Sequence, residues 1–313
     1  MNQKLSIIIP VYNEEGNVDR LYEKLIKDLA QITLNYEIFF IDDGSVDSTF
    51  SKLQRIHLEN NKVKVIKFRR NFGKSIALNT AFTKVNGDVI ITMDGDLQDD
   101  SEEISRFLAK IEAGFDMVSG WKFPRNDPIA KRLPSRIFNS LTCKLTGLKL
   151  HDFNCGFKAY KKEVTETISL YGEMHRYTPA LAAFYGFRIA EIKVRHHPRT
   201  EGRSKFGFSR IFKGMFDLIT VKYLTTYASR PLHVFGIPGF ISLFIGVLIG
   251  LYLIFLRIIE NIILGDRPLL LLSVLLIILG LQFISLGLLG EMITYREVKR
   301  ENVNRFIETF LSD

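Results

Sequence analysis

The sequence predicts an α/β protein in which a mostly parallel sheet with flanking helices precedes a hairpin of two transmembrane helices. Two observations support this prediction. Short apolar runs alternate with amphipathic stretches through the N-terminal part of the chain, which is typical of a parallel sheet covered by helices on both faces. Two later segments, 231–256 and 268–290, contain no Asp, Glu, Lys or Arg, and each is longer than the ~20 apolar residues that cross a bilayer. A chain of 313 residues has room for both parts.

Each predicted strand is a short apolar run, and each helix between the strands has apolar residues at helical spacing. The first helix, for example, places Leu21, Leu25 and Leu29 on one face. The predicted strands cover residues 5–10, 36–41, 63–68 and 88–93, and the predicted helices cover 17–29, 49–58 and 74–84.

Ligands of such sheets bind beyond the carboxyl ends of the strands, where segments 11–15, 42–45, 69–74 and 94–99 are expected to meet. In the last segment, Asp94, Gly95 and Asp96 directly follow an apolar run, and Gln98 lies two residues further on. These residues offer oxygen ligands to a hard cation such as Mg²⁺ or Mn²⁺, and a nucleotide diphosphate would complete the coordination. Alone, the motif also fits an ordinary polar turn. Its place on a shared rim favours a metal-diphosphate site.

Two other rim segments suit a nucleoside. Tyr12 offers an aromatic face and its neighbours Asn13 and Glu14 offer hydrogen-bond acceptors, while Asp42 and Asp43 begin a tight turn. Carboxylates in such a turn accept hydrogen bonds from hydroxyl groups. Either segment alone also fits a polar loop, but together with the adjacent carboxylate motif they predict a nucleotide site.

Other nucleotide-binding and catalytic motifs are excluded by the residues present. No G-x-G-x-x-G follows the first strand, and the Gly73-Lys74 pair is not a phosphate loop because Phe68 stands where that motif requires glycine. No Ser-His-Asp arrangement or metal-spaced His pair stands out. His196 and His197 are adjacent, and neighbouring residues of an extended strand point to opposite sides, so both cannot face one site.

The net charge of +8 is concentrated near the membrane-proximal segments, which suits anionic lipid and phosphate and argues against nucleic acid as a partner. Lys and Arg flank the outer ends of both spans, whereas acidic residues balance them in the connecting loop, so both termini are predicted to be cytoplasmic. The flanking residues are Lys213, Lys222 and Arg230 before the first span, and Arg296, Lys299, Arg300 and Arg305 after the second.

No signal peptide is recognised before the first strand. Cys143 and Cys155 lack metal-ligand spacing and are expected to be thiols.

Segments 129–145 and 208–227 combine basic and apolar residues at helical spacing. Such amphipathic helices lie in the headgroup layer of a membrane or pack on a sheet by the same apolar face. Both arrangements are open for the first segment, and the interfacial one is favoured for the second.

Within the first span, Ser242, Gly246 and Gly250 form a stripe of small residues. Such a stripe either joins the two spans of one chain or makes an oligomer.

Taken together, these motifs resemble the family 2 glycosyltransferases of the Rossmann-like GT-A fold. Among them, the chain is most similar to polyprenyl-phosphate glycosyltransferases such as dolichol-phosphate mannose synthase and bacterial undecaprenyl-phosphate glucosyltransferases. The resemblance covers nearly the whole chain. The motifs that carry it span residues 10–15, 42–45, 71–74, 94–99, 152–158 and 199–205.

The resemblance implies roles for individual residues. The nucleoside would be held by Pro10, Tyr12, Asn13, Glu14, Ile41 and Asp43. The metal would be held by Asp94, Asp96 and Gln98, with Lys74, Gly95 and Lys122 also in the donor site and Arg199 and Lys205 reaching the phosphates from a loop. Lys122 and Lys158 stand where many relatives carry arginine, and lysine keeps the charge but not the bidentate geometry.

The resemblance also implies the reaction, an inverting single displacement that moves a sugar from a nucleotide diphosphate to a polyprenyl phosphate. Mg²⁺ or Mn²⁺ would neutralise the departing diphosphate as a Lewis acid, and Arg199 and Lys205 would assist. The acceptor phosphate is already largely ionised, so positioning matters more than a strong base. Asp152 is expected near that acceptor, and Arg132, Ser135 and Arg136 are the candidate ligands of the lipid phosphate.

These inferences give an integral membrane enzyme with a catalytic domain over residues 1–206, an interfacial region over 207–230, spans over 231–257 and 267–291, and a basic tail over 292–313. A bacterial plasma membrane is the expected location, and a homo-oligomer through the spans is open. A UDP-hexose such as UDP-glucose is favoured among several sugars, including mannose, N-acetylhexosamine and a modified pentose. The alternatives are a processive polysaccharide synthase, whose Gln-x-x-Arg-Trp motif does not surround Trp121, and a catalytically silent scaffold that kept the fold.

Overall fold

The structure is a computed structural model that describes residues 3–32, 34–123, 139–140, 142–144, 146–197, 220, 223, 231–259 and 268–300, with side chains to Thr294. The chain divides into two compact units, Met1–Val221 and Lys222–Asp313. The boundary between them lies inside the segment 207–230 that the sequence predicts to be interfacial, a segment whose described residues are only Thr220 and Tyr223.

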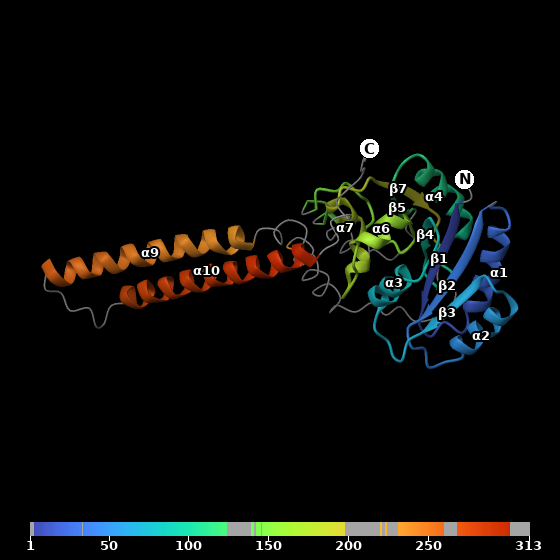
Figure 1. Cartoon of the computed structure of the whole chain (residues 1–313), viewed down its shortest axis with the longest axis horizontal. Coiled ribbons are helices and arrows are strands. Elements are labelled where there is room, and N and C mark those ends of the chain that lie inside the picture. The colour runs from blue at the N-terminus through green and yellow to red at the C-terminus, as the bar shows by residue number, and fades with distance from the viewer. Residues whose placement is uncertain are drawn as a thin grey trace. The chain divides into compact units, whose positions relative to one another are not determined.

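The first unit alternates strands and helices in the order that the sequence predicts (Figure 1). Its strands are β1 (Lys4–Val11), β2 (Asn35–Asp42), β3 (Val63–Lys67), β4 (Val89–Thr92), β5 (Met117–Lys122), β6 (Lys158–Lys161) and β7 (Ile189–Val194). Its helices are α1 (Val18–Leu29), α2 (Thr49–Glu59), α3 (Lys74–Phe82), α4 (Ile104–Glu112), α6 (Lys162–Thr167) and α7 (Thr178–Phe184), with short 3₁₀ turns η1 (Ser101–Glu103) and η2 (Met174–Arg176).

The seven strands form one mixed sheet in the order β3-β2-β1-β4-β6-β5-β7. β6 is antiparallel to both of its neighbours, β4 and β5, whereas the other pairs of neighbouring strands are parallel. The predicted mostly parallel sheet is thereby confirmed, and the four predicted strands correspond to β1, β2, β3 and β4. Because β1, β2 and β4 end side by side, the loops that follow them meet at one edge of the sheet.

The sheet is covered on both faces. Alternate residues of β1, including Leu5, Ile7 and Ile9, share one core with the apolar faces of α1, α2 and α4. α3 and α7 lie on the opposite side (Figure 1), where Ala77, Leu78 and Ala81 of α3 are buried. The period-two alternation of β1 between these cores fixes the strand register and therefore the positions of the loops at its carboxyl end.

A buried carboxylate, Glu37 of β2, ties the strands together away from that edge. It accepts hydrogen bonds from Lys4 Nζ at 2.7 Å, Ser6 Oγ at 2.7 Å, Lys64 Nζ at 2.9 Å and the Asn86 N–H at 2.9 Å. Although burial opposes ionisation, these donors lower the pKa of Glu37 from 4.5 to about 2. The ionised carboxylate is therefore the form that the folded domain stabilises.

We expect Glu37→Gln to lower the stability of the domain by about 2 kcal/mol at pH 7. The pKa shift corresponds to about 3 kcal/mol, and partial exposure of the two lysines reduces that value. Because the folded-state pKa is the lower one, this stability is complete above pH 4.5 and is lost as the pH falls toward 2. Melting temperatures at pH 7 and pH 3 will therefore show a variant deficit that shrinks in acid. Glu59→Gln, at a site 59% exposed, is the control, and a deficit independent of pH would contradict this account.

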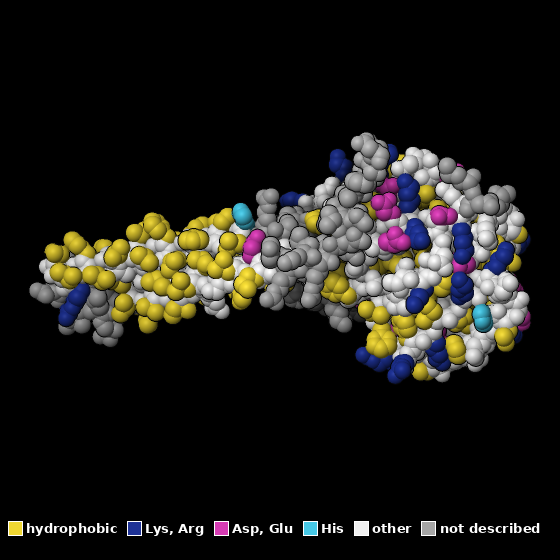
Figure 2. All heavy atoms as spheres, viewed as in Figure 1, with side chains coloured by type: hydrophobic (Ala, Val, Ile, Leu, Met, Phe, Trp, Pro, Cys, Tyr) yellow, Lys and Arg dark blue, Asp and Glu magenta, His cyan; other side chains and the backbone are white. Residues whose placement is uncertain are grey.

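The second unit contains two long helices, α9 (Pro231–Ile259) and α10 (Pro268–Arg300). Both are long and apolar enough to cross a membrane, and only 22% and 11% of their most apolar windows are buried. Figure 2 shows the apolar side chains along the outside of this hairpin. Core helices of a water-soluble protein bury such surfaces, so the exposure favours a bilayer as their surroundings.

The stripe of small residues in α9 faces α10. Ser242 Oγ donates a hydrogen bond to the Leu276 carbonyl at 2.8 Å, and Ser273 Oγ donates one to the Gly246 carbonyl at 2.8 Å. A methyl group on Gly246 would lie 2.9 Å from the backbone nitrogen of Ile277. Of the two arrangements that the sequence leaves open for the stripe, the structure shows the contact between the two spans of one chain.

Candidate active site

The segment after β4 forms a closed loop whose polar groups bind one another. The backbone N–H of Asp94 donates to Asp99 Oδ2 at 3.0 Å, and that of Gln98 donates to Asp96 Oδ1 at 3.2 Å. Leu97, between them, has a φ of 62°, a backbone conformation that is costly for a residue with a side chain. The loop therefore holds Asp94, Asp96 and Gln98 in a defined arrangement at the carboxyl end of the strand.

Two glycines permit this arrangement through close contacts. A Cβ on Gly95 would lie 2.7 Å from Val11 Cγ1, so the loop passes directly over the end of β1. A Cβ on Gly156 would lie 2.6 Å from Asp94 Oδ1 and 2.7 Å from Oδ2. The Gly156 carbonyl is fixed by a 2.9 Å hydrogen bond from Thr92 Oγ1. Segment 152–158 thus forms one wall of the Asp94 carboxylate site.

Two lysines balance part of the negative charge here. Lys74 Nζ, at the start of α3, binds Asp94 Oδ1 directly, and Lys122 Nζ lies 3.7 Å from Asp99 Oδ1. Although burial alone would raise it, Lys74 and Lys122 hold the pKa of Asp94 below its usual range. Burial likewise opposes the charge on Lys122, but Asp99 and the other nearby carboxylates raise its pKa. Lys122 therefore remains cationic beside these carboxylates.

Asp99 is in a different electrostatic environment. Burial, together with the negative charges of Asp94 and Asp96, raises its pKa from 3.8 to about 6, against the opposing effect of Lys122. Its Oδ2 accepts the Asp94 N–H, so it supports the loop from behind. Asp99 could not be distinguished from the neighbouring acidic residues by sequence, because an aspartate that braces a loop and one that binds a ligand are the same residue type.

A second polar layer lies behind the loop and was not predicted. Lys158 is 2% exposed, and its ammonium donates to the Phe153 and His175 carbonyls at 3.4 and 3.1 Å and to Thr178 Oγ1 at 2.9 Å. Burial lowers the pKa of Lys158 from 10.5 to about 7. His175 Nδ1 lies 2.9 Å from Ser75 Oγ, and burial lowers its pKa well below 6.5. Lys158 therefore joins segment 152–158 to η2 instead of reaching the surface.

The predicted nucleoside segments lie beside this loop and bind each other. The backbone N–H of Asn13 donates to Ser45 Oγ at 2.9 Å, and that of Glu14 donates to Thr49 Oγ1 at 2.8 Å. Asp43 accepts the N–H groups of Phe72 and Gly73 at 2.7 and 2.9 Å. Burial raises the Asp43 pKa, which these two hydrogen bonds oppose. The same residues that were predicted to hold a nucleoside thus also join three loops of the rim.

The remaining predicted residues differ in burial. Ile41 is fully buried within β2, whereas Pro10 and Tyr12 are partly accessible at the end of β1. Asp152 is 1% exposed, and its Oδ1 accepts the Asn154 N–H at 3.0 Å. The predicted phosphate and lipid ligands Arg132, Ser135, Arg136, Arg199 and Lys205 lie outside the described residues.

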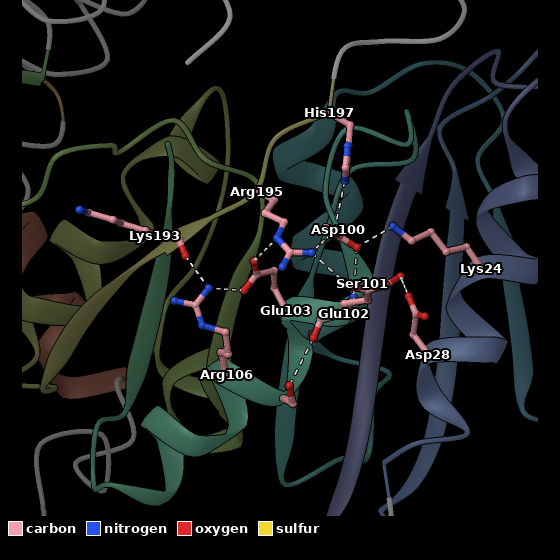
Figure 3. Close-up of polar contacts among 11 residues, drawn as sticks. Lys24, Asp28, Asp100, Ser101, Glu102, Glu103, Arg106, Lys193, Arg195 and His197 are labelled. Carbon is pink, nitrogen blue, oxygen red and sulfur yellow. Dashed lines mark hydrogen bonds and ion pairs between the residues drawn. The ribbon is translucent and has the colours of Figure 1, made fainter. Parts of the chain in front are cut away.

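The residues after the loop connect it to the end of β7. Asp100 binds Lys24 Nζ at 2.6 Å and His197 Nε2 at 3.1 Å (Figure 3). Arg195 Nη1 lies 3.3 Å from Glu102, and Arg106 donates to the Lys193 carbonyl at 2.9 Å. These contacts hold segment 193–197 against the loop that carries Asp94 and Asp96.

The donor set fits Mg²⁺ or Mn²⁺ as a partial coordination shell. Asp94, Asp96 and Gln98 are oxygen donors, the ligand type that these ions prefer. Lys122 is close to the carboxylates of Asp94, Asp99 and Asp152, Asp96 is close to Asp99, and Lys74 binds Asp94. Even with Lys158 behind the loop, carboxylates outnumber lysines here, which suits a divalent cation. Within the described residues, no three His, Cys, Asp or Glu side chains converge as a metal group.

Comparison with known sequences gives consistent results. A family model described as glycosyl transferase family 2 matches residues 6–169. Dodecaprenyl-phosphate galacturonate synthase of Rhizobium johnstonii is 36% identical over 295 residues, which cover 93% of this chain and 87% of that protein. Undecaprenyl-phosphate 4-deoxy-4-formamido-L-arabinose transferase of Shewanella sediminis is 38% identical over 291 residues, covering 92% and 86%.

Solved structures support the fold. Glucosyl-3-phosphoglycerate synthase of Mycobacterium tuberculosis, in complex with Mn²⁺, UDP and glucosyl-3-phosphoglycerate, superposes with a TM-score of 0.55 at 16% identity, over 71% of this chain and 80% of that one. A mannosyltransferase from Pyrobaculum calidifontis, in complex with GDP-Man and Mn²⁺, gives a TM-score of 0.53 at 19% identity, over 72% and 64%. The chain therefore belongs to glycosyl transferase family 2 and is a glycosyltransferase with the GT-A fold.

Proposed function

We propose that this glycosyltransferase moves a sugar from a nucleotide diphosphate to a polyprenyl phosphate at the cytoplasmic face of a membrane, with inversion at the anomeric carbon. The observation that carries the proposal is the loop of Asp94, Asp96 and Gln98, which lies at the carboxyl edge of the sheet beside two lysines. The names of the relatives from Rhizobium johnstonii and Shewanella sediminis support the lipid acceptor, and the two exposed apolar helices are suited to anchor the chain in the membrane that would contain it.

The donor site follows from this arrangement. Tyr12, Asn13 and Glu14 are proposed to contact the nucleoside that is attached to the diphosphate, with Pro10, Ile41 and Asp43 shaping the adjoining edge. Asp94, Asp96 and Gln98 would hold Mg²⁺ or Mn²⁺, which neutralises charge on the leaving diphosphate when bound. The two solved structures above contain Mn²⁺ with a nucleotide or nucleotide sugar, which supports the same ion here.

Lys74 and Lys122 add fixed positive charge close to the same diphosphate, and Arg199 and Lys205 are proposed to approach it from the segment after β7. Preorganised cations of this kind stabilise the charge that develops as the sugar–phosphate bond breaks. The incoming lipid phosphate is an anion with its own nucleophilic oxygen. The protein therefore has to align it, and Asp152, Arg132, Ser135 and Arg136 are the proposed residues on that side.

The direct test is transfer of label from a donor panel to undecaprenyl phosphate by the purified full chain in detergent with Mg²⁺ or Mn²⁺. UDP-glucose is our first donor. The panel also includes GDP-mannose, UDP-N-acetylglucosamine, and nucleotide-linked galacturonate and formamido-arabinose, which the names of the relatives suggest. We expect one donor to give a lipid-linked product that is lost with EDTA. The absence of product from every donor, with dolichyl phosphate tested in parallel, would rule the proposal out.

A prediction for Lys74 follows from its contact with Asp94. In the free protein it occupies the carboxylate that a cation needs, so Lys74→Met should tighten Mn²⁺ binding in the absence of donor. The variant also loses a charge-assisted hydrogen bond to the diphosphate, which raises the donor KM about tenfold. Electron paramagnetic resonance titration of Mn²⁺ and steady-state kinetics measure the two effects, with Lys52→Met on α2 as the control. Weaker Mn²⁺ binding by the donor-free variant would show that Lys74 does not compete for Asp94.

A further inference from the structure

The side chain of Gln98 is held by two residues at the end of β7. Its Nε2 lies 3.3 Å from the His197 carbonyl oxygen and 3.4 Å from His196 Nε2. The backbone in this region is also fixed, because the His197 N–H donates to the Gln98 carbonyl at 3.0 Å and Asp99 forms an antiparallel bridge with His196. Gln98 is therefore fastened to β7 through both its backbone and its amide group.

These contacts determine which end of the amide group is turned away from β7. A carbonyl oxygen only accepts hydrogen bonds, so the atom of Gln98 that faces the His197 carbonyl must be the nitrogen. The reversed amide would place two oxygens against each other with no hydrogen between them. Gln98 Nε2 thus has one hydrogen for the His197 carbonyl and one for His196, and among the described residues no donor contacts Gln98 Oε1.

The chemistry of the glutamine then fixes the role of the imidazole. Because Gln98 Nε2 is a donor, His196 Nε2 must be the acceptor, and the ring proton must be on Nδ1. An acceptor at this position satisfies the second amide hydrogen and leaves Oε1 for a cation. Partners behind a metal ligand commonly set its orientation in this way.

We propose that His196 is a positioning residue of the metal site, which orients the Gln98 amide so that Oε1 is presented to the divalent cation. This inference rests on the proposed function, since it takes Gln98 as a metal ligand. His196 itself does not bind the cation. It acts through Gln98 alone.

The adjacent histidine provides a matched control. The two histidines have different side-chain partners: His196 lies against Gln98, whereas the His197 ring is directed at Asp100 (Figure 3). The contact of His197 with Gln98 uses the backbone carbonyl, which alanine keeps. Alanine at position 197 therefore removes the contact with Asp100 but keeps the backbone partner of Gln98, whereas alanine at position 196 removes a partner of the Gln98 amide.

The experiment measures Mn²⁺ affinity of the full-length protein in detergent by electron paramagnetic resonance, without donor or acceptor. We expect His196→Ala to weaken binding about tenfold or more and His197→Ala to change it by less than about twofold. His196→Gln, whose side-chain oxygen reaches the position of Nε2, should restore most of the affinity. His196→Asn, whose oxygen lies nearer the position of Nδ1, should not. Melting temperatures verify that each variant is folded.

A double-mutant cycle separates the possible outcomes. In a Gln98→Ala background, His196→Ala should add less than a twofold loss, because its effect passes through the missing amide. An equal loss in both backgrounds would show that His196 binds the cation itself and would overturn the inference. Unchanged affinity in the single variant His196→Ala would overturn it as well. If Gln98→Ala alone has no effect on Mn²⁺ affinity, the metal assignment of the proposed function fails, which is a distinct result.

Discussion

Asp96→Ala will abolish sugar transfer while the protein remains folded. Asp96 is 8% exposed, and its Oδ1 closes the loop by accepting the Gln98 N–H. Alanine removes a proposed metal ligand and the bond that holds a second one. Loss of several kcal/mol of stabilisation of the leaving diphosphate corresponds to a fall in kcat/KM of about a thousandfold or more. Transfer of labelled sugar to polyprenyl phosphate in detergent measures it.

Asp96→Asn separates the two functions of this side chain. Its amide oxygen can still accept the Gln98 N–H, so the loop keeps its shape, but the negative charge is lost. We expect this variant to melt at nearly the wild-type temperature and to remain about a hundredfold or more impaired. Asp19→Asn on α1, which weakens ion pairs with Arg55 and Lys52, should retain activity. Full activity of Asp96→Ala would remove the metal assignment altogether.

Gly156→Ala is the second substitution with a large expected effect. The new methyl group would lie 2.6–2.8 Å from the three atoms of the Asp94 carboxylate. The backbone cannot easily retreat, because Thr92 holds the Gly156 carbonyl. The carboxylate will rotate away instead, since it is the end of a side chain. A displacement of about 1 Å in an active site costs about a hundredfold in rate.

The informative result for Gly156→Ala is the contrast between two measurements. We expect Mn²⁺ affinity and kcat/KM to fall together, with a small change in melting temperature. Gly236→Ala, in α9, makes the same substitution where the nearest atoms belong to the Leu232 side chain at 3.2 Å, and it should change neither. A Gly156→Ala protein with wild-type metal affinity would show that the Asp94 carboxylate tolerates the methyl group in place.

The N-terminal half of the fold was predictable because its signals are local. β1, β2, β3 and β4 are apolar runs bounded by turn residues, and each is followed by a helix or a polar loop. β6, of only four residues, contains two lysines, so its sequence does not indicate a buried strand. Its antiparallel position between β4 and β5 depends on pairing across a long sequence separation, which no local pattern encodes.

Only part of the candidate site could be predicted from the sequence. Asp94, Asp96 and Gln98 follow a strong strand signal, so their shared position on the rim could be inferred. The supporting groups could not. Asp99 accepts a hydrogen bond that holds the loop, buried Lys158 links segment 152–158 to η2, and His175 lies against Ser75. Each of these roles depends on the tertiary surroundings of one side chain. From the sequence, Gly156 is predicted to lie in a turn. In the structure, glycine is needed there because a Cβ would collide with the Asp94 carboxylate.

The position of β6 in the sheet has a consequence for the order in which the nascent chain assembles. β5 is translated before β6, yet β6 pairs with β4 on one side and β5 on the other. A partly synthesised chain therefore leaves a gap in its sheet until residues 158–161 emerge. Gly156 arrives with them and completes the wall beside Asp94.

The first apolar span begins only at Pro231, well after β6 has been translated. Since domains tend to fold from the N-terminus as they are made, the donor site can close while the first span is still being synthesised. Under the proposed function, the donor site can therefore form before the two helices that would give access to the lipid acceptor.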